Sequence, residues 1–226
     1  LSYMGNMLGH NEAKQNSKIC VVVADISPAG SMQKFRTEFP NRFINCGVAE
    51  QFMTGIAAGI SLDGYLPITY TITPFNTLRN LEQIKIDLCY QNLPSIIVGT
   101  GSGLSYSALG STHHSLDDIG HMLNIPNLNI YTPCDKNEIE FCLLDAIKSQ
   151  KPSYIRLGKK GEQNIHVDIK NKKNFKSINT IKKGKKVALC GIGTITYNLL
   201  AVKDILKDRK NIDASVYGIT KIQNND

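Results

Sequence analysis

A glutamate at the start of a helix made of small residues is the feature of this sequence best suited to chemistry. Glu50 is followed by Gly55, Ala57, Ala58 and Gly59. Small residues let a helix pack closely against a neighbouring element, and a helix N-terminus holds a carboxylate in a defined place. A carboxylate fixed in this way is a candidate for acid-base chemistry. The alternative is an N-terminal capping charge.

Further polar side chains follow this segment. Arg79 lies four residues after Phe75, so the two share roughly one helical face. Arg79 could reach a bound cofactor or substrate, or form a surface ion pair with Glu82. His113 and His114 are imidazoles that titrate near neutrality. Because adjacent residues rarely point the same way, the pair predicts no metal site.

Six cysteines are scattered singly among apolar neighbours, without the CxxC spacing of a zinc or redox site. We expect reduced thiols, most of them packed in the core. They are Cys20, Cys46, Cys89, Cys134, Cys142 and Cys190.

Short β-branched runs alternate with longer amphipathic segments, which predicts an α/β fold with a parallel sheet flanked by helices. Asp135 is the expected cap of the last helix. The expected strands are Ile19–Ala24, Ile68–Ile72, Ser95–Val98, Leu128–Tyr131 and Ser153–Ile155. The expected helices are Ala49–Leu62, Pro74–Gln91, Ser115–Leu123 and Lys136–Lys148.

A stretch rich in lysine, asparagine and glycine divides the chain. We predict a first domain over residues 1–157, a linker over 158–185 and the start of a second α/β domain over 186–226. Expected elements of the second domain are the strand Val187–Cys190, a helix over Thr196–Lys207 and the strand Ala214–Tyr217. One βαβ unit is too small to close a core, so we expect an incomplete domain.

Composition indicates a globular protein. The chain has 226 residues, 42% of them hydrophobic, with a formal net charge of +7. The excess lysines gather between Lys159 and Lys186 rather than on an aromatic-studded face, so we expect no nucleic-acid partner. No run of about 18 apolar residues predicts a membrane span, and no secretory signal opens the sequence. A cytoplasmic location is the default expectation.

Five motifs in one order carry a resemblance to a known family. The segment NCGVAEQ, the small-residue helix after it and the phenylalanine of TITPF resemble the pyrimidine-binding domain shared by transketolases and 1-deoxyxylulose-5-phosphate synthases. The segments ADISPAGSM, GSTHHSLDD, PNLNIYTPCDKNE and PSYIRLGKKG resemble the other motifs of that domain. The resemblance covers almost the whole first domain.

The resemblance implies thiamine diphosphate as cofactor. It makes Glu50 the carboxylate that hydrogen-bonds N1′ of the aminopyrimidine and so favours the imino tautomer that activates the thiazolium C2. It places Phe75 on the aminopyrimidine ring as a stacking partner, and Asp25, Ile26 and Arg79 beside the cofactor. A carboxylate with this role must lie in a pocket with apolar walls.

The resemblance also implies a sugar phosphate substrate. His113 matches a histidine near the thiazole and the substrate, with His114 beside it. Arg156 matches the arginine that holds the substrate phosphate, a task suited to a bidentate guanidinium. Ala29 and Gly101 depart from the phosphate-binding serine and substrate histidine of transketolases, so the sugars can differ from the usual ones.

The family's metal site is absent from this sequence. Its GDG motif, which holds Mg²⁺ and the diphosphate on another domain, does not occur in the 226 residues. A second polypeptide or an N-terminal portion would have to supply it. We therefore expect the C-terminal subunit of a split transketolase that transfers two-carbon ketol units. We expect an N-terminal partner subunit and a homodimer contact through the Glu50 helix.

Other functions remain open at this point. The chain could be a subunit similar to a 2-oxoacid dehydrogenase β-chain or to 1-deoxyxylulose-5-phosphate synthase, although the DRAG segment of the synthase is replaced by GTGSGLSYSALG. It could also be an assembly subunit without catalytic activity. The presence of Glu50, Phe75 and His113 together favours an active enzyme.

Overall fold

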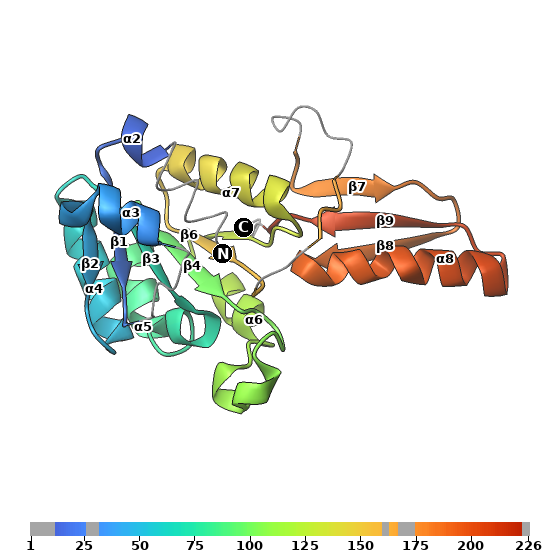
Figure 1. Cartoon of the computed structure of the whole chain (residues 1–226), viewed down its shortest axis with the longest axis horizontal. Helices are drawn as coiled ribbons and strands as arrows, with labels where there is room; N and C mark the ends of the chain where they lie inside the picture. Colours follow the sequence, from blue (N-terminus) through green and yellow to red (C-terminus); the bar gives the residue numbers. More distant parts are fainter. Residues whose placement is uncertain (1–11, 26–31, 160–162, 167–174, 223–226) are drawn as a thin grey trace.

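A seven-stranded sheet forms the centre of the protein (Figure 1). The computed structural model describes residues 12–25, 32–159, 163–166 and 175–222. The strand order is β10-β5-β6-β4-β3-β1-β2, and every neighbouring pair is parallel except β10 with β5. The strands are β1 (Ile19–Val23), β2 (Phe43–Asn45), β3 (Leu66–Ile72), β4 (Ile96–Thr100), β5 (Asn129–Tyr131), β6 (Ser153–Arg156) and β10 (Lys221–Ile222).

Helices cover both faces of this sheet, as the buried clusters show. Because successive strand residues point to opposite faces, Ile96 and Val98 of β4 pack in one cluster and Ile97 in the other. The first cluster includes residues of α2 (Ala13–Gln15), α3 (Gln33–Glu38) and α7 (Lys136–Ser149). The second includes residues of α4 (Glu50–Leu62), the π-helix η4 (Ile84–Tyr90) and α6 (Asp118–Leu123). The predicted α/β class with a parallel, helix-flanked sheet is confirmed.

A second, three-stranded sheet extends to one side of the first (Figure 1). It consists of β7 (Ile178–Lys182), β9 (Ala214–Ile219) and β8 (Val187–Ile192) in that order, with α8 (Asn198–Lys210) between β8 and β9 in sequence. The short helix η8 (Gly193–Tyr197) precedes α8. The division of the chain into domains stays a prediction.

Two strands near the expected linker and the end of the second domain were not predicted. Strand β7 lies inside the stretch that we expected to be a linker, because it pairs antiparallel with β9. After β9 the chain returns to the first sheet, where β10 pairs with β5 at its edge. The two sheets are therefore joined by more than one crossing of the chain.

The helix expected over Pro74–Gln91 is interrupted. The structure has the 3-10 helix η3 (Thr73–Asn76), then α5 (Leu81–Gln83) and η4. Asn76 explains the break, because its amide donates to the Val98 carbonyl at 2.9 Å instead of facing solvent. The helix expected from Ser115 begins only at Asp118, because Ser115 pairs with the backbone of Gly103.

The other helices agree more closely with the prediction. The Asp135 carboxylate caps α7 by accepting from the N–H groups of Asn137 and Glu138, as expected. Strand β2, which has three residues, was not predicted. Among the residues that the structure describes, no helix is long and apolar enough to cross a membrane.

Candidate functional site

The candidate residues gather at the carboxyl ends of parallel strands. Asp25 follows β1, Glu50 follows β2, Phe75 follows β3 and Arg156 ends β6. Parallel strands end at one edge of a sheet, and ligands of open α/β sheets bind there. The fold therefore brings together side chains that lie far apart in the sequence.

Glu50 is a buried carboxylate at the first turn of α4, with 5% of its surface exposed. Nη1 of Arg79 donates to its Oε1 at 2.8 Å. A buried carboxylate needs a cation or a hydrogen-bond donor, and Arg79 supplies both. Arg79 thus pairs with Glu50 rather than with Glu82, which was one of its two possible partners.

Arg79 also covers the ring of Phe75. Its Cζ lies 4.0 Å from the ring centroid, a cation–π contact. The guanidinium is 43% exposed and reaches Glu50 at the same time. A planar cation thus lies against the aromatic ring while it donates to the carboxylate. An aromatic ring that stacked on this face of Phe75 and bonded to Glu50 would have to displace the guanidinium.

His113 also contacts Phe75. The two ring centroids are 5.0 Å apart in an edge-to-face arrangement. The Thr112 hydroxyl lies 3.0 Å from Nδ1 of His113, which orients the imidazole. His114 turns elsewhere, because its Nε2 lies 3.3 Å from the Ser107 carbonyl. The two histidines thus point to different partners, as the sequence predicted.

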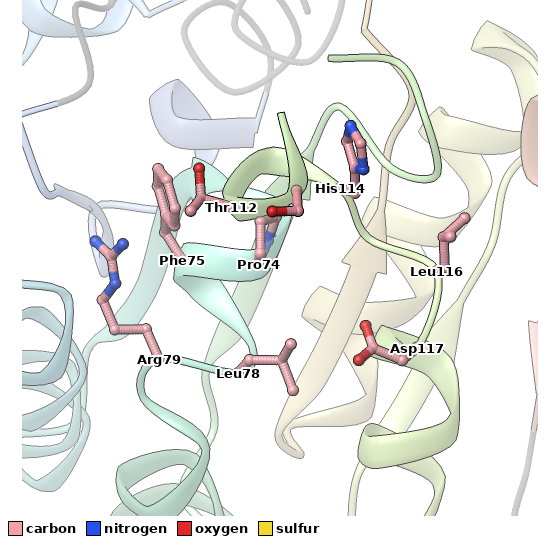
Figure 2. A pocket seen from close by; sticks show the side chains of 9 residues that line it. Pro74, Phe75, Leu78, Arg79, Thr112, His114, Leu116 and Asp117 are labelled. Carbon is pink, nitrogen blue, oxygen red and sulfur yellow. The ribbon is translucent and has the colours of Figure 1, made fainter. Parts of the chain in front are cut away.

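A cavity of about 650 Å³ opens beside these residues. Figure 2 shows Arg79 and Phe75 on one side of it and His114, Leu116 and Asp117 on the other. Its wall combines apolar side chains with a guanidinium, an imidazole and a carboxylate. Small-molecule sites commonly have this mixture of an apolar wall and few polar groups.

Arg156 has a different environment from the one that the sequence suggested. Its Nε and Nη2 donate to the two oxygens of Asp118, at 2.7 and 3.3 Å, and Nη2 also donates to the Ser115 carbonyl at 3.1 Å. The Tyr154 hydroxyl donates to the same Asp118 at 2.6 Å. Arg156 lines a separate cavity of about 550 Å³, and Leu116 lines both. Its phosphate-binding role stays a prediction.

Asp25 lies at the edge of the described region. Its backbone N–H donates to Oδ1 of Asn45 at 3.0 Å, and the same oxygen accepts from the N–H of Gly47. Asn45 therefore fixes the ends of β1 and β2 together. The predicted cofactor contact of Ile26 and the departure at Ala29 fall outside the described residues.

Two residues that the sequence reasoning missed lie next to the site. The ring of Tyr106 is 6.4 Å from that of His113, and the Lys159 ammonium lies 4.7 Å from the Tyr106 ring centroid. Gly101 has φ +75, and a Cβ at this position would overlap the Tyr106 ring. The packing of Tyr106 therefore explains why glycine occupies position 101. No local pattern in the sequence marks Tyr106.

Comparison with known proteins identifies the family of this chain. Residues 4–162 match the model of the transketolase pyrimidine binding domain. The chain belongs to the transketolase family. Membership in this family implies dependence on thiamine diphosphate, as the motifs had suggested.

The curated transketolase-family relatives include separate subunits. An apulose-4-phosphate transketolase subunit of Actinobacillus succinogenes is 37% identical over 214 residues, which cover 93% of this chain and 67% of that protein. The 6-deoxy-6-sulfo-D-fructose transketolase subunit of a Clostridium species is 29% identical, with 85% and 60% covered. A 1-deoxy-D-xylulose-5-phosphate synthase of Clostridium perfringens is 28% identical, with 93% and 34% covered.

Solved transketolase structures have the same fold. A split gene transketolase, described as an inactive β4 tetramer, aligns with a TM-score of 0.83 at 30% identity and covers 97% of this chain and 70% of that one. A transketolase of Pichia stipitis aligns with a TM-score of 0.82 at 19% identity, which supports the fold alone. The homologues thus include the C-terminal type of transketolase subunit that the motifs predicted.

Proposed function

We propose that this chain is the C-terminal subunit of a split transketolase and transfers two-carbon ketol units between sugars or sugar phosphates. The observation that carries the proposal is the contact of a buried carboxylate, an aromatic ring and a guanidinium beside an open cavity. These groups meet in a fold shared with a split gene transketolase.

The residues present fit the aminopyrimidine of thiamine diphosphate. Glu50 would hold the pyrimidine nitrogen, and Phe75 would hold the ring face. The cofactor supplies a carbon nucleophile when it is bound. Burial of Glu50 keeps water from competing for its oxygens, so that the carboxylate can keep or share a proton at a fixed position. Arg79 donates to Glu50 in this structure, and a bound ring would have to take its place.

The remaining site residues face the substrate in this proposal. His113, oriented by Thr112, can donate to or accept from a sugar oxygen near the ring of Phe75. His114 lines the cavity and adds a polar contact. Arg156 would reach a substrate phosphate only from the neighbouring cavity that it lines. Asp25 and Ile26 complete the proposed cofactor contacts.

The proposal requires a partner subunit. We place the Mg²⁺ and diphosphate site on an N-terminal subunit with a GDG motif, because this sequence has none. The outer face of α4 exposes Phe52 and Leu62, with Gly55 and Gly59 between them. An exposed apolar face with small residues suits close pairing with a second copy of this chain. A cytoplasmic location is part of the same proposal.

Calorimetry tests the division of the cofactor site. Thiamine diphosphate and Mg²⁺ are titrated into the chain alone and into its mixture with an N-terminal subunit that carries a GDG motif. We expect micromolar binding only in the mixture, which should then transfer ketol units between sugar phosphates. Micromolar binding by the chain alone would refute the split site. Formation of 1-deoxyxylulose 5-phosphate would favour the synthase, and binding without turnover would favour an assembly role.

A further inference from the structure

Three metal-ligating side chains converge at a second place in the molecule, at the start of α7. Cys134 precedes the cap of α7, Glu138 lies in its first turn, and His166 comes from the short described segment 163–166. All three are buried, and their ligand atoms lie within 4.8 Å of one another. None of these residues lines the cavity beside Phe75.

The spacing of the three donors is close to that of a tetrahedral metal site. Nε2 of His166 lies 2.8 Å from Oε1 of Glu138 and 3.8 Å from Sγ of Cys134. Zinc takes sulfur at about 2.3 Å and nitrogen or oxygen at about 2.0–2.2 Å, so its ligands stand roughly 3.3–3.7 Å apart. The observed distances lie on either side of this range, and shifts of about half an ångström would reach it.

A shell of hydrogen bonds holds the three ligands in place. Oδ2 of Asp135 accepts from the backbone N–H of His166 at 2.9 Å, and the Asn137 amide donates to the His166 carbonyl at 3.1 Å. The Asn179 amide donates to Oε1 of Glu138 at 3.3 Å. Metal sites commonly orient their ligands through such outer contacts. The same Asp135 also caps α7, so the ligands are fixed to the helix start.

We propose that Cys134, Glu138 and His166 bind one Zn²⁺ ion. A set of one sulfur, one nitrogen and one oxygen suits zinc and disfavours Mg²⁺ and Ca²⁺, which prefer oxygen alone. Binding displaces the thiol proton of Cys134 and replaces the hydrogen bond between Glu138 and His166 with bonds to the metal. The resulting thiolate, carboxylate and neutral imidazole balance the two charges of the ion, so the buried site stays neutral.

The position of the site gives it a structural role. Cys134 lies in the connection between β5 and α7 and Glu138 lies on α7, whereas Asn179 lies on β7 of the second sheet. The Asn179 amide also donates to the Thr220 hydroxyl between β9 and β10 at 2.8 Å. A zinc ion at this point would fasten the segment 163–166 to the start of α7, next to the contact between Asn179 and Glu138. Structural zinc sites contribute directly to folding stability.

Metal binding by the full chain tests this proposal. The chain, freed of metal by a chelator, is titrated with Co²⁺ as a spectroscopic probe and with Zn²⁺ in competition. We expect one ion per chain, a thiolate-to-Co²⁺ charge-transfer band, and a melting temperature that rises with Zn²⁺. In Cys134→Ala, the band should vanish and the affinity should fall by more than about 10-fold.

A matched control separates this thiol from the others. Cys142 is also buried on α7 but lies outside the cluster, and Cys190 is exposed. Cys142→Ala and Cys190→Ser should keep the band and the affinity of the unaltered chain. The proposal is overturned if the unaltered chain binds no stoichiometric Zn²⁺, or if Cys134→Ala keeps the band. Because these readouts do not use catalysis, they do not depend on the proposed function.

Discussion

Arg79 and Arg156 each pair with a buried carboxylate, but the two ion pairs differ in their surroundings. Arg79 is 43% exposed and gives Glu50 one hydrogen bond at 2.8 Å. Arg156 is 13% exposed, and its partner Asp118 is 1% exposed. Asp118 accepts two bonds from Arg156 and a third from the Tyr154 hydroxyl. Arg79 can move away from Glu50 into solvent, whereas Arg156 is held against Asp118 by several buried hydrogen bonds.

A ligand could therefore replace Arg79 as the partner of Glu50, whereas Arg156 is a structural partner of Asp118. Glu50 is held by a side chain that can move away at little cost, so its carboxylate is available to a ligand. Asp118 is held by groups that are themselves buried, and burial raises the pKa of the Tyr154 hydroxyl well above its ordinary value, as does Asp118 itself. A network in which each polar group has a partner fixes the end of β6 beside α6.

We expect the largest loss of stability when the ion pair between Arg156 and Asp118 is broken. Arg156→Met leaves Asp118 buried without its cation, which typically costs about 3–5 kcal/mol. Chemical denaturation of the chain measures this loss. The double variant Arg156→Met/Asp118→Leu should recover part of the lost stability, because it no longer has an unpaired carboxylate buried at position 118. A stable Arg156→Met enzyme with a raised KM for phosphorylated sugars alone would instead show that Arg156 binds substrate phosphate.

Breaking the ion pair between Arg79 and Glu50 should change cofactor binding more than stability. Arg79→Ala frees the face of Phe75 and removes the competitor for Glu50, so thiamine diphosphate should bind the assembled enzyme a few-fold more tightly. Its cost in stability should be smaller than that of Arg156→Met, because the Arg79 side chain is 43% exposed. Calorimetry on the assembled enzyme and denaturation of the chain measure the two effects. Weaker cofactor binding would mean that Arg79 itself holds the cofactor.

A third ion pair should give the smallest effect. Asp145 on α7 accepts from Lys221 of β10 and from the Tyr131 hydroxyl, each at 2.8 Å. Burial opposes ionisation of Asp145, but the hydrogen bonds from Lys221 and Tyr131 and the charges of Lys221 and Lys148 together outweigh it, and the pKa of Asp145 lies below its ordinary value. The pair therefore stabilises the fold above an unfolded pKa of about 3.9, and this contribution is lost as the pH falls through the folded pKa.

The change Lys221→Met tests this pair. We expect a loss of about 1 kcal/mol or less at neutral pH, because both side chains are partly exposed. Thermal melts between neutral pH and pH 3 should show that the two proteins converge at the acid end. A constant difference across this range would assign the loss to the packing of the Lys221 stem on Tyr131 instead.

The sequence predicted five strands of the first sheet because they are apolar or β-branched runs between turn signals. Strands β2 and β10, which have three and two residues and lie at the two edges of the sheet, were missed. The helix over residues 74–91 was predicted as continuous, because nothing local shows that Asn76 bonds to β4. Secondary structure here depends on contacts across the sheet.

The site was predicted in part for the same reason. Motifs identified Glu50, Phe75 and His113, and the fold brings Phe75 into contact with His113 and with the partner of Glu50. The pairing of Glu50 with Arg79 spans 29 residues and could not be read from spacing. Arg156 was assigned to phosphate by the resemblance, and its pairing with Asp118, 38 residues away, could not be read from the sequence. Sequence supplied the residue types, and packing decided their partners.

The central claim is that Glu50 is a chemical group of the cofactor site rather than a helix charge. Glu50→Gln keeps the size of the side chain and its capacity to hydrogen-bond, but it removes the acidic group that can share a proton. Glu82→Gln, which makes the same change at an exposed carboxylate on α5, is the matched control. Both variants are assembled with the N-terminal subunit, Mg²⁺ and thiamine diphosphate.

The decisive measurement is hydrogen–deuterium exchange at C2 of the bound cofactor. We predict that Glu50→Gln slows this exchange by about 10²-fold or more, the scale of a lost acid-base group, while the cofactor stays bound. Glu82→Gln should exchange at the rate of the unaltered enzyme. A Glu50→Gln enzyme that exchanges as fast as the unaltered one would contradict the account and leave Glu50 with only a structural role.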